Sequence, residues 1–328
     1  MLELGSVLTH RLVSEFAELV PRGSLVVLNN TRVRRARLHG NRLPGGGRVE
    51  IFLLHPVDAA GVEWAALGRA NKPLRLGTLI EGDGLRVEVV ARDAEGTLRV
   101  RIAGAGDSLE QVEASIERVG HVPLPPYVKR PDDAIDQERY QTVFAEQLGS
   151  VAAPTAGLHL TEGAIQRLRE RGVQVQSVTL HVGVGTFRPV AVDDLDQHVM
   201  HSEEVEVSEL LCGAVKRTRA AGAAVIAVGT TVVRALESAA LSGEIQPYHG
   251  ATRLLIQPGY SFQVVDALLT NFHMPRSTLL ALVSAFAGRE RLMAAYASAL
   301  ERGYRFLSYG DAMWIPKRAH SVEIPYRK

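Results

Sequence analysis

Two kinds of hydrophobic pattern alternate along the chain. Continuous apolar runs predict buried strands, and the segments between them have the spacing and end residues of helices. Thr161 and Ser208 can cap two of these helices through their hydroxyl groups, and Gly172 and Gly222 can end them. Strands are predicted at residues 24–30, 173–182, 223–229 and 265–270, and helices at 161–172, 208–222 and 231–243. Such alternation favours a mainly parallel α/β sheet.

The pattern differs between residue 35 and about residue 122. Short runs of β-forming residues follow one another there, separated by Gly, Asp and Asn turns, which is typical of a small antiparallel barrel. The proline-rich stretch at 121–134 resembles a linker. We therefore expect an α/β fold, α+β as a multidomain whole, in which an α/β layered domain (1–36 and 126–328) carries an inserted small antiparallel β-barrel domain (37–125).

Composition places the chain among ordinary globular proteins. Of its 328 residues, 46% are hydrophobic and 22% charged, and no apolar run is long enough for a transmembrane helix. The N-terminal residues lack the basic head and apolar core of a secretion signal. The single cysteine, Cys212, can form no internal disulfide. A cytoplasmic location and no membrane partner are expected.

Small and polar residues follow each predicted strand. In parallel sheets, ligands bind beyond the carboxyl ends of the strands, where glycines allow close approach and Thr, Asn and His supply hydrogen bonds. We therefore expect a site at this edge. The segments concerned are 29–32, 181–186, 229–231 and 271–273, with Pro275 expected to open a helix, and the loop 154–159 that precedes the Thr161 helix.

Several familiar sites are disfavoured by the same residues. The Gly183–Gly185 segment lacks the third glycine of a dinucleotide fingerprint. His198 and His201 are not part of a His-Glu-x-x-His motif, so we expect no metal. Ser284 lies in a helical pattern without the glycines of a hydrolase elbow. Each polar residue at a strand end can also be a satisfied structural group, and Arg234 can be a structural arginine.

Arginines gather at the start of the predicted insert. Six lie between Arg32 and Arg48, with no acidic residue among them, although the net charge of the chain is only +1. The cluster can contact phosphates or can be a solvated strand edge.

Long motifs along the chain resemble one family. The chain is similar, from Leu25 to about Ile315, to the S-adenosylmethionine:tRNA ribosyltransferase-isomerases of queuosine biosynthesis (the QueA family). The motifs that carry the resemblance are LVVLNNTRVRRARLHG, HVPLPPYVKRPDD, RYQTVFAEQLGSVAAPTAGLHLT, VTLHVGVGTFRPV, HVMHSEEVEV, VIAVGTTVVRALES, PGYSFQVVDALLTNFHMPRSTLLALVSAFAG and YRFLSYGDAMWI. Family members usually begin with a further segment, so this chain starts inside the family's first region.

The resemblance implies an uncommon reaction. The family transfers and isomerises the ribosyl moiety of S-adenosylmethionine onto 7-aminomethyl-7-deazaguanine at the wobble position of tRNA, which gives epoxyqueuosine, adenine and methionine. S-adenosylmethionine is consumed as a substrate, and neither a cofactor nor a metal is implied. Removal of a proton beside the sulfonium would start the reaction, and a neutral histidine suits that role near pH 7.

Candidate roles are assigned by inference from these chemical demands. His159 or His181 is expected to be the base, with His273 as a third candidate and Thr155 beside them. Substrate contacts are expected from Asn30, Thr31, Arg32, Gly157, Gly183, Gly185, Thr186, Thr230, Thr231, Asn271, Tyr309 and Asp311.

A basic track is expected to hold the anticodon stem of tRNA. Its predicted members are Arg34, Arg35, Arg37, Arg69, Lys72, Lys129 and Arg130. The resemblance implies tRNAs for Asp, Asn, His and Tyr, and we expect a monomer. Two other functions remain open at this point: a methyltransferase that yields S-adenosylhomocysteine, and an N-terminally shortened, catalytically impaired member that binds tRNA without turnover.

Overall fold

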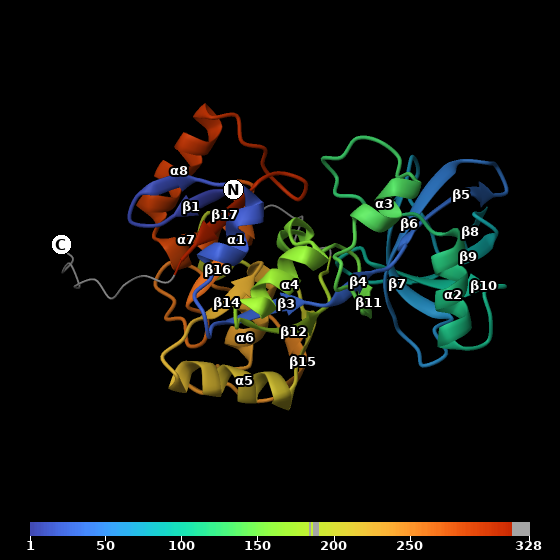
Figure 1. Ribbon diagram of the computed structural model, residues 1–328. Helices are drawn as coiled ribbons and strands as arrows, with labels where there is room; N and C mark the ends of the chain where they lie inside the picture. Colours follow the sequence, from blue (N-terminus) through green and yellow to red (C-terminus); the bar gives the residue numbers. More distant parts are fainter. Residues whose placement is uncertain (184, 186–189, 317–328) are drawn as a thin grey trace. The chain divides into compact units, whose positions relative to one another are not determined.

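A computed structural model describes residues 1–183, 185 and 190–316 (Figure 1). The chain divides into two compact units, and each is described by itself. The first unit contains Met1–Asn30, Thr142–Ala145 and the chain from Pro154 onward, and the second contains Thr31–Gln141 and Glu146–Ala153.

The first unit is built on a sheet of nine strands. Four neighbouring strands at its centre, β12, β3, β14 and β16, are parallel to one another. The strands flanking them pair antiparallel with their neighbours, apart from the parallel pair β1–β17, so the sheet is mixed rather than mainly parallel. In spatial order the strands are β15 (Tyr248–Thr252), β13 (Glu203–Val207), β12 (Gln174–Leu180), β3 (Leu25–Asn29), β14 (Val225–Val228), β16 (Ala267–Asn271), β17 (Ala312–Ile315), β1 (Leu2–Leu4) and β2 (Leu8–His10).

Helices cover this sheet, and their ends follow the predicted chemistry. Thr161 accepts a hydrogen bond from the Ala164 N–H, and Ser208 caps its helix in the same way. The helix expected to open at Pro275 begins instead at Thr278, because the hydroxyl of Ser277 caps it. The elements are η1 (Val13–Glu15), α1 (Phe16–Leu19), η2 (Thr155–His159), α4 (Glu162–Glu170), η4 (Leu195–Gln197), α5 (Glu209–Ala220), α6 (Thr230–Ser238), α7 (Thr278–Ala287) and α8 (Arg289–Glu301).

The main core lies between one face of the sheet and α1, α4 and η2. Val26 and Leu28 of β3 belong to this core, as do Phe16 and Trp314, whose rings meet edge to face at 5.2 Å. Side chains alternate between the two faces of a strand. The intervening residues of β3 therefore point to the opposite face, where α5 and α6 pack.

The second unit contains a closed six-stranded antiparallel barrel (Figure 1). The predicted insert is therefore confirmed as a small barrel. The second unit also has two helices that the sequence did not predict, one within the predicted insert and one after it. The barrel strands are β5 (Arg37–Leu43), β6 (Arg48–Pro56), β7 (Glu63–Ala70), β8 (Leu79–Gly82), β9 (Leu85–Arg92) and β10 (Leu98–Ala103). The helices are α2 (Leu109–Val119) and α3 (Ala134–Arg139), and β4 (Thr31–Val33) pairs in parallel with β11 (Gln147–Ser150).

Among the described residues, no helix combines the length and the apolar character needed to cross a bilayer.

Candidate active site

The carboxyl ends of the four parallel strands meet at one edge of the first unit's sheet. Strand pairing aligns Asn29 of β3 with Val178 of β12, and Leu269 of β16 with Val228 of β14. The polar segments that follow these strands therefore share an edge, as the sequence predicted. Asn29 itself, which the sequence analysis did not single out beyond its segment, links three of them. Its side-chain amide contacts the backbone of Leu180 at 2.9 and 3.1 Å and the Thr231 hydroxyl at 3.3 Å.

Asn271 joins Thr155 and His159 in one hydrogen-bonded chain. Its amide oxygen accepts from the Thr155 hydroxyl at 2.9 Å, and its nitrogen lies 3.0 Å from Nε2 of His159. The same nitrogen also donates to the carbonyl of Leu307 at 3.3 Å. Because a carbonyl can only accept, this contact fixes the orientation of the amide. Nε2 of His159 must then carry the lone pair and Nδ1 the proton.

His159 is neutral at physiological pH. Burial lowers the pKa of its imidazole to about 4, and the negative charge of Asp311 opposes this only in part. A neutral imidazole with its lone pair on Nε2 can accept a proton there. It also adds no positive charge to the site.

The loop after α8 brings Leu307 and Asp311 to this edge. Leu307 has φ +75°, a conformation that costs a non-glycine residue energy and is often found at functional sites. Its N–H donates to the carbonyl of Phe272 at 2.9 Å, and the Asp311 carboxylate accepts from the Arg305 N–H at 2.8 Å. Tyr309, in the same loop, is 42% exposed. The loop therefore places a carboxylate where its charge acts on His159, and it also carries an exposed phenol.

His273 lies two residues beyond Asn271 but has different partners. Its Nε2 lies 2.9 Å from the Thr270 hydroxyl, and its backbone N–H donates to the Tyr296 hydroxyl at 2.8 Å. Burial lowers its pKa to about 4 as well. The structure thus gives His273 hydrogen bonds within its own strand end and helix α8, separate from the Thr155–Asn271–His159 chain.

Gly157 is needed for packing inside the first unit. A Cβ at this position would lie 2.7 Å from Cζ of Phe144 and 2.9 Å from Cγ2 of Thr142, closer than side chains approach. Gly157 is also buried. The glycine that was expected to touch a substrate therefore allows η2 to pack against this aromatic ring.

The remaining predicted residues of the first unit lie along the same edge or beside it. Asn30 accepts from the Thr179 hydroxyl at 2.8 Å, and Thr230 and Thr231 are buried in the first turn of α6. The N–H of Gly183 donates to the Glu203 carboxylate at 3.0 Å, and Gly185 packs against the ring of His201. His181 is bonded through its backbone to the Glu204 carbonyl at 3.0 Å. Thr186 lies outside the described residues.

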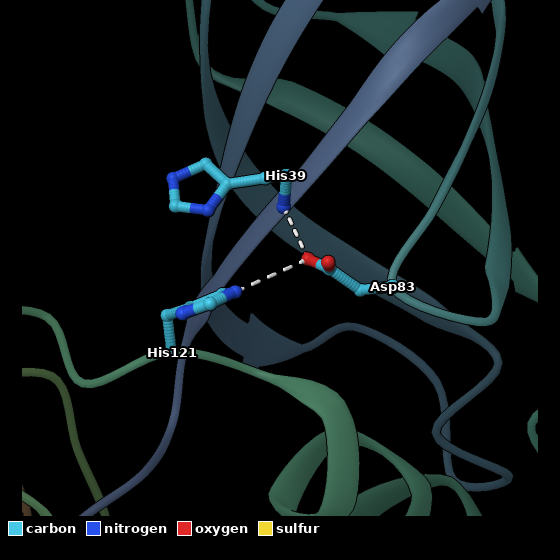
Figure 2. A group of neighbouring side chains, drawn as sticks. All are labelled: His39, Asp83 and His121. Atoms are coloured by element: carbon cyan, nitrogen blue, oxygen red, sulfur yellow. Dashed lines mark hydrogen bonds and ion pairs between the residues drawn. The ribbon is translucent and has the colours of Figure 1, made fainter. Parts of the chain in front are cut away.

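One group in the described part of the chain has the side chains to hold a metal ion. It consists of His39, Asp83 and His121 of the second unit, with ligand atoms within 4.8 Å of one another (Figure 2). No sequence signal marks this group, because its members lie far apart along the chain and belong to no spaced motif.

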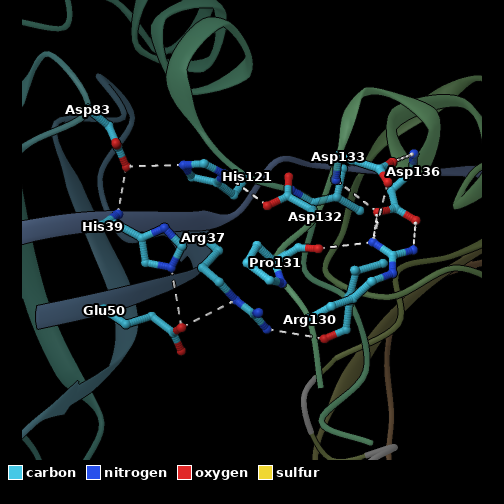
Figure 3. Close-up of polar contacts among 12 residues, drawn as sticks. Arg37, His39, Glu50, Asp83, His121, Arg130, Pro131, Asp132, Asp133 and Asp136 are labelled. Carbon is cyan, nitrogen blue, oxygen red and sulfur yellow. Dashed lines mark hydrogen bonds and ion pairs between the residues drawn. The ribbon is translucent and has the colours of Figure 1, made fainter. Parts of the chain in front are cut away.

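Acidic partners neutralise part of the predicted basic track in the second unit. Arg34 is buried with its side chain over the ring of Trp64 and is paired with Glu113 at 2.5 Å, so it is not available to bind RNA. Arg37 lies 3.8 Å from Glu50, and Arg130 binds both carboxylate oxygens of Asp136 (Figure 3).

Other members of the basic track are not neutralised by an ion pair among the described residues. Arg35 donates to the side chain of Gln137 at 2.6 Å. Arg32, which was predicted as a substrate contact and not as a member of the track, is exposed and lies 3.9 Å from Glu117. For Arg69, Lys72 and Lys129, all exposed, the described residues provide no acidic partner. Thr31, buried in β4, bonds weakly to the Gln147 carbonyl at 3.4 Å.

Comparison with known proteins adds independent information. A family model described as "Queuosine biosynthesis protein" matches residues 2–315. The S-adenosylmethionine:tRNA ribosyltransferase-isomerase of Sorangium cellulosum (strain So ce56) is 55% identical over 330 aligned positions, covering 93% of this chain and 87% of the relative. The protein of the same name from Anaeromyxobacter dehalogenans (strain 2CP-C) is 50% identical over 94% of this chain and 89% of its own length.

A solved structure agrees with these sequence matches. The crystal structure of S-adenosylmethionine tRNA ribosyltransferase from Thermotoga maritima is 32% identical, with a TM-score of 0.51, and the match covers 96% of this chain and 91% of that one. Together with the strand-end site, these matches show that the chain belongs to the queuosine biosynthesis family of S-adenosylmethionine:tRNA ribosyltransferase-isomerases.

Proposed function

We propose that the chain is an S-adenosylmethionine:tRNA ribosyltransferase-isomerase. It transfers the ribosyl moiety of S-adenosylmethionine to 7-aminomethyl-7-deazaguanine at the tRNA wobble position and isomerises it, forming epoxyqueuosine and releasing adenine and methionine. The observation that carries this function is the identity of 48–55% to relatives of that name over 93–94% of the chain. The chain is thus a transferase and isomerase of queuosine biosynthesis.

His159 is proposed as the base that removes the proton beside the sulfonium. Its imidazole is neutral, and its lone pair lies on Nε2, where the Asn271 amide now donates. The substrate C–H would take the position of that amide N–H. A neutral histidine suits a sulfonium substrate, because a protonated ring would repel it.

Asn271 is proposed to keep Nε2 of His159 unprotonated until the substrate C–H takes its place there, and Thr155 to fix the orientation of the Asn271 amide. Asp311 and Tyr309 are proposed to bind polar groups of S-adenosylmethionine. The Asp311 carboxylate can accept from the methionine ammonium group or a ribose hydroxyl. The remaining strand-end residues, Asn30, Gly183, Gly185, Thr186, Thr230 and Thr231, line the same edge in this proposal. His181 and His273 stay alternative bases.

The RNA partner is proposed as tRNA with the anticodons for Asp, Asn, His and Tyr, bound by a monomer in the cytoplasm. Its phosphates would contact exposed cations of the second unit, since phosphate contacts dominate affinity for nucleic acids. The target base must leave the stack to reach a pocket. No cofactor is proposed, because S-adenosylmethionine itself is consumed.

Product analysis tests the function directly. The chain is mixed with S-adenosylmethionine and tRNA that carries the aminomethyl-deazaguanine base, and mass spectrometry measures adenine and modified nucleoside. Adenine together with epoxyqueuosine is expected. S-adenosylhomocysteine would instead indicate a methyltransferase, and bound tRNA with no product would indicate a catalytically impaired member.

Single-turnover rates of three variants then separate the candidate bases. His159→Asn is expected to abolish turnover while S-adenosylmethionine binding persists, whereas His273→Asn should retain most of the rate. His181→Asn is measured in parallel. Full turnover by a folded His159→Asn variant would remove His159 from the mechanism and transfer the assignment to whichever histidine variant is inactive.

A further inference from the structure

We propose that His39, Asp83 and His121 of the barrel unit form a binding site for a divalent transition-metal cation of the Zn²⁺ type. The site belongs entirely to the second unit and takes no part in the reaction proposed above. Imidazole nitrogen and carboxylate oxygen are ligands that Zn²⁺ prefers, and two histidines with one carboxylate leave a fourth position for water.

The three ligand groups already face one another. Nε2 of His121 lies 3.7 Å from Oδ2 of Asp83, and the two imidazole rings have centroids 4.6 Å apart. Figure 2 shows one ring nitrogen of His39 turned toward the side on which Asp83 and His121 lie. In a tetrahedral zinc site, bond lengths of about 2.0–2.2 Å place ligand atoms about 3.4 Å apart. The His121–Asp83 pair is already close to this separation, and the remaining ligand atoms, which lie within 4.8 Å of one another, would move closer when the ion binds.

A second carboxylate lies near the other nitrogen of each histidine. Nδ1 of His121 lies 2.9 Å from Asp132, and Nε2 of His39 lies 3.4 Å from Glu50 (Figure 3). Histidines that bind metals commonly donate their other N–H to a carboxylate, which fixes the tautomer and makes the ring a stronger ligand. His121 has that arrangement through its hydrogen bond to Asp132, and the Glu50 carboxylate lies at ion-pair distance from the outer nitrogen of His39.

Backbone contacts fix the three ligands in place. Asp83 lies in the two-residue turn between β8 and β9 with φ +50°, and its carboxylate accepts from the His39 N–H at 2.6 Å. His121 is paired with Arg37 through its N–H, which donates to the Arg37 carbonyl at 2.8 Å. The ligands therefore come from segments that are already joined by main-chain contacts.

Close backbone approach at two glycines makes this positioning possible. A Cβ on Gly82 would lie 2.2 Å from the His39 carbonyl oxygen, and one on Gly120 would lie 2.1 Å from that of Arg35. The absence of a side chain at Gly82 lets the turn that carries Asp83 pack against β5. In the same way, Gly120 lets the segment that carries His121 pack against the residues just before β5. Close contacts between main-chain segments therefore set the backbone positions of Asp83 and His121.

The charges of the group also favour a cation. Three carboxylates, those of Asp83, Glu50 and Asp132, surround two imidazoles, and Arg37 is the cation nearest Glu50. A dication between the imidazoles and Asp83 would offset this negative charge. The side chains of the three ligands are 46%, 21% and 35% exposed, so an ion and its water can reach the site from solvent.

Calorimetric titration of the full-length chain with Zn²⁺, after removal of bound metal with a chelator, tests the site. One equivalent is expected to bind. His39→Ala and His121→Ala should abolish this binding, and Asp132→Asn and Glu50→Gln should weaken it about 10–100-fold, as removal of an outer carboxylate does. His55→Ala, on exposed His55 of β6, is the matched control and should bind as the wild type does.

Two further measurements keep the test decisive if a variant does not fold. Zn²⁺ should raise the unfolding temperature of the wild type and of His55→Ala. Its affinity for the wild type should fall as the pH drops through the range in which imidazoles take up protons. Absence of Zn²⁺ binding by the wild type, or equal binding by wild type and by folded His39→Ala and His121→Ala, overturns the proposal.

Discussion

Glu203 of β13 and Arg234 of α6 form an ion pair whose side chains are only 5% and 8% exposed. The pair does more than join a strand to a helix. Glu203 also accepts from the Gly183 N–H after β12, and Arg234 donates through Nε to the Leu254 carbonyl at 3.1 Å. It thus holds the segment after β12 against α6 at the edge where substrate is proposed to bind.

Removal of one partner of this pair should be costly. Glu203→Gln or Arg234→Met leaves a buried charge without its counterion, and we expect each to lower the free energy of unfolding by about 3–5 kcal/mol. The double variant should be destabilised by less than the sum of the two single effects. Urea unfolding of the four proteins measures this coupling, and strictly additive effects would show that the pair does not act as a unit.

Stability should depend on pH through His159. Its pKa is about 4 in the folded protein and 6.5 in its ordinary state, so the unfolded chain takes up the proton first as the pH falls. Stability is therefore complete above about pH 6.5 and declines between there and pH 4, by up to about 3 kcal/mol. His159→Gln should make this part of the curve less steep in thermal unfolding without flattening it, because burial also lowers the pKa of His273 to about 4. The exposed-site variant His55→Gln should leave the slope unchanged.

A methyl group at Gly157 should destabilise the first unit. The new Cβ would overlap the ring of Phe144, and overpacking of this kind costs about 1–3 kcal/mol. Gly163→Ala is the matched control, because its Cβ would meet only the Thr161 hydroxyl at 3.9 Å within an exposed part of α4. That control should be neutral or stabilising by about 0.5–1 kcal/mol. Equal effects of the two substitutions on the unfolding temperature would refute the packing explanation.

Reversal of charge at Arg69 and Lys72 should weaken tRNA binding. These exposed cations have no acidic partner among the described residues, so their full charge is available to phosphates. Arg69→Glu/Lys72→Glu should lower affinity and reduce the slope of log affinity against log salt by about 1 for each phosphate that is no longer neutralised. Arg86→Glu, at a cation already paired with Glu81 on the barrel, is the control. Affinity for S-adenosylmethionine should stay unchanged in both.

The sequence was most informative where local chemistry decides structure. Thr161 and Ser208 cap the helices that follow them, and the buried strand at Leu25–Asn29 lies where its apolar run predicts. The helix near Pro275 was placed three residues too early, because the hydroxyl of Ser277 marks its start more strongly than the proline does. Antiparallel strands at the sheet edges carry no local signal that separates them from parallel ones.

Other features depend on residues that are distant in sequence. Nothing in the local pattern around Arg34 distinguishes it from its neighbours, yet it is buried beside Glu113 and Trp64. Likewise, Asn271 was expected at the site, but its bonds to Thr155 and His159 join segments more than 110 residues apart. Roles of this kind require the tertiary fold.

The crowding at Gly82 and Gly120 has a consequence for how freely the barrel can vary. In both cases the neighbouring atom is a main-chain oxygen, so no repacking of side chains can make room for a substituent. A saturation mutagenesis library selected for folded protein should therefore be depleted of every replacement at these two positions, while Gly47, which has open space around it and no left-handed backbone conformation, should tolerate far more. The amino-acid replacements that this barrel accepts are therefore limited by the points where its backbone segments touch.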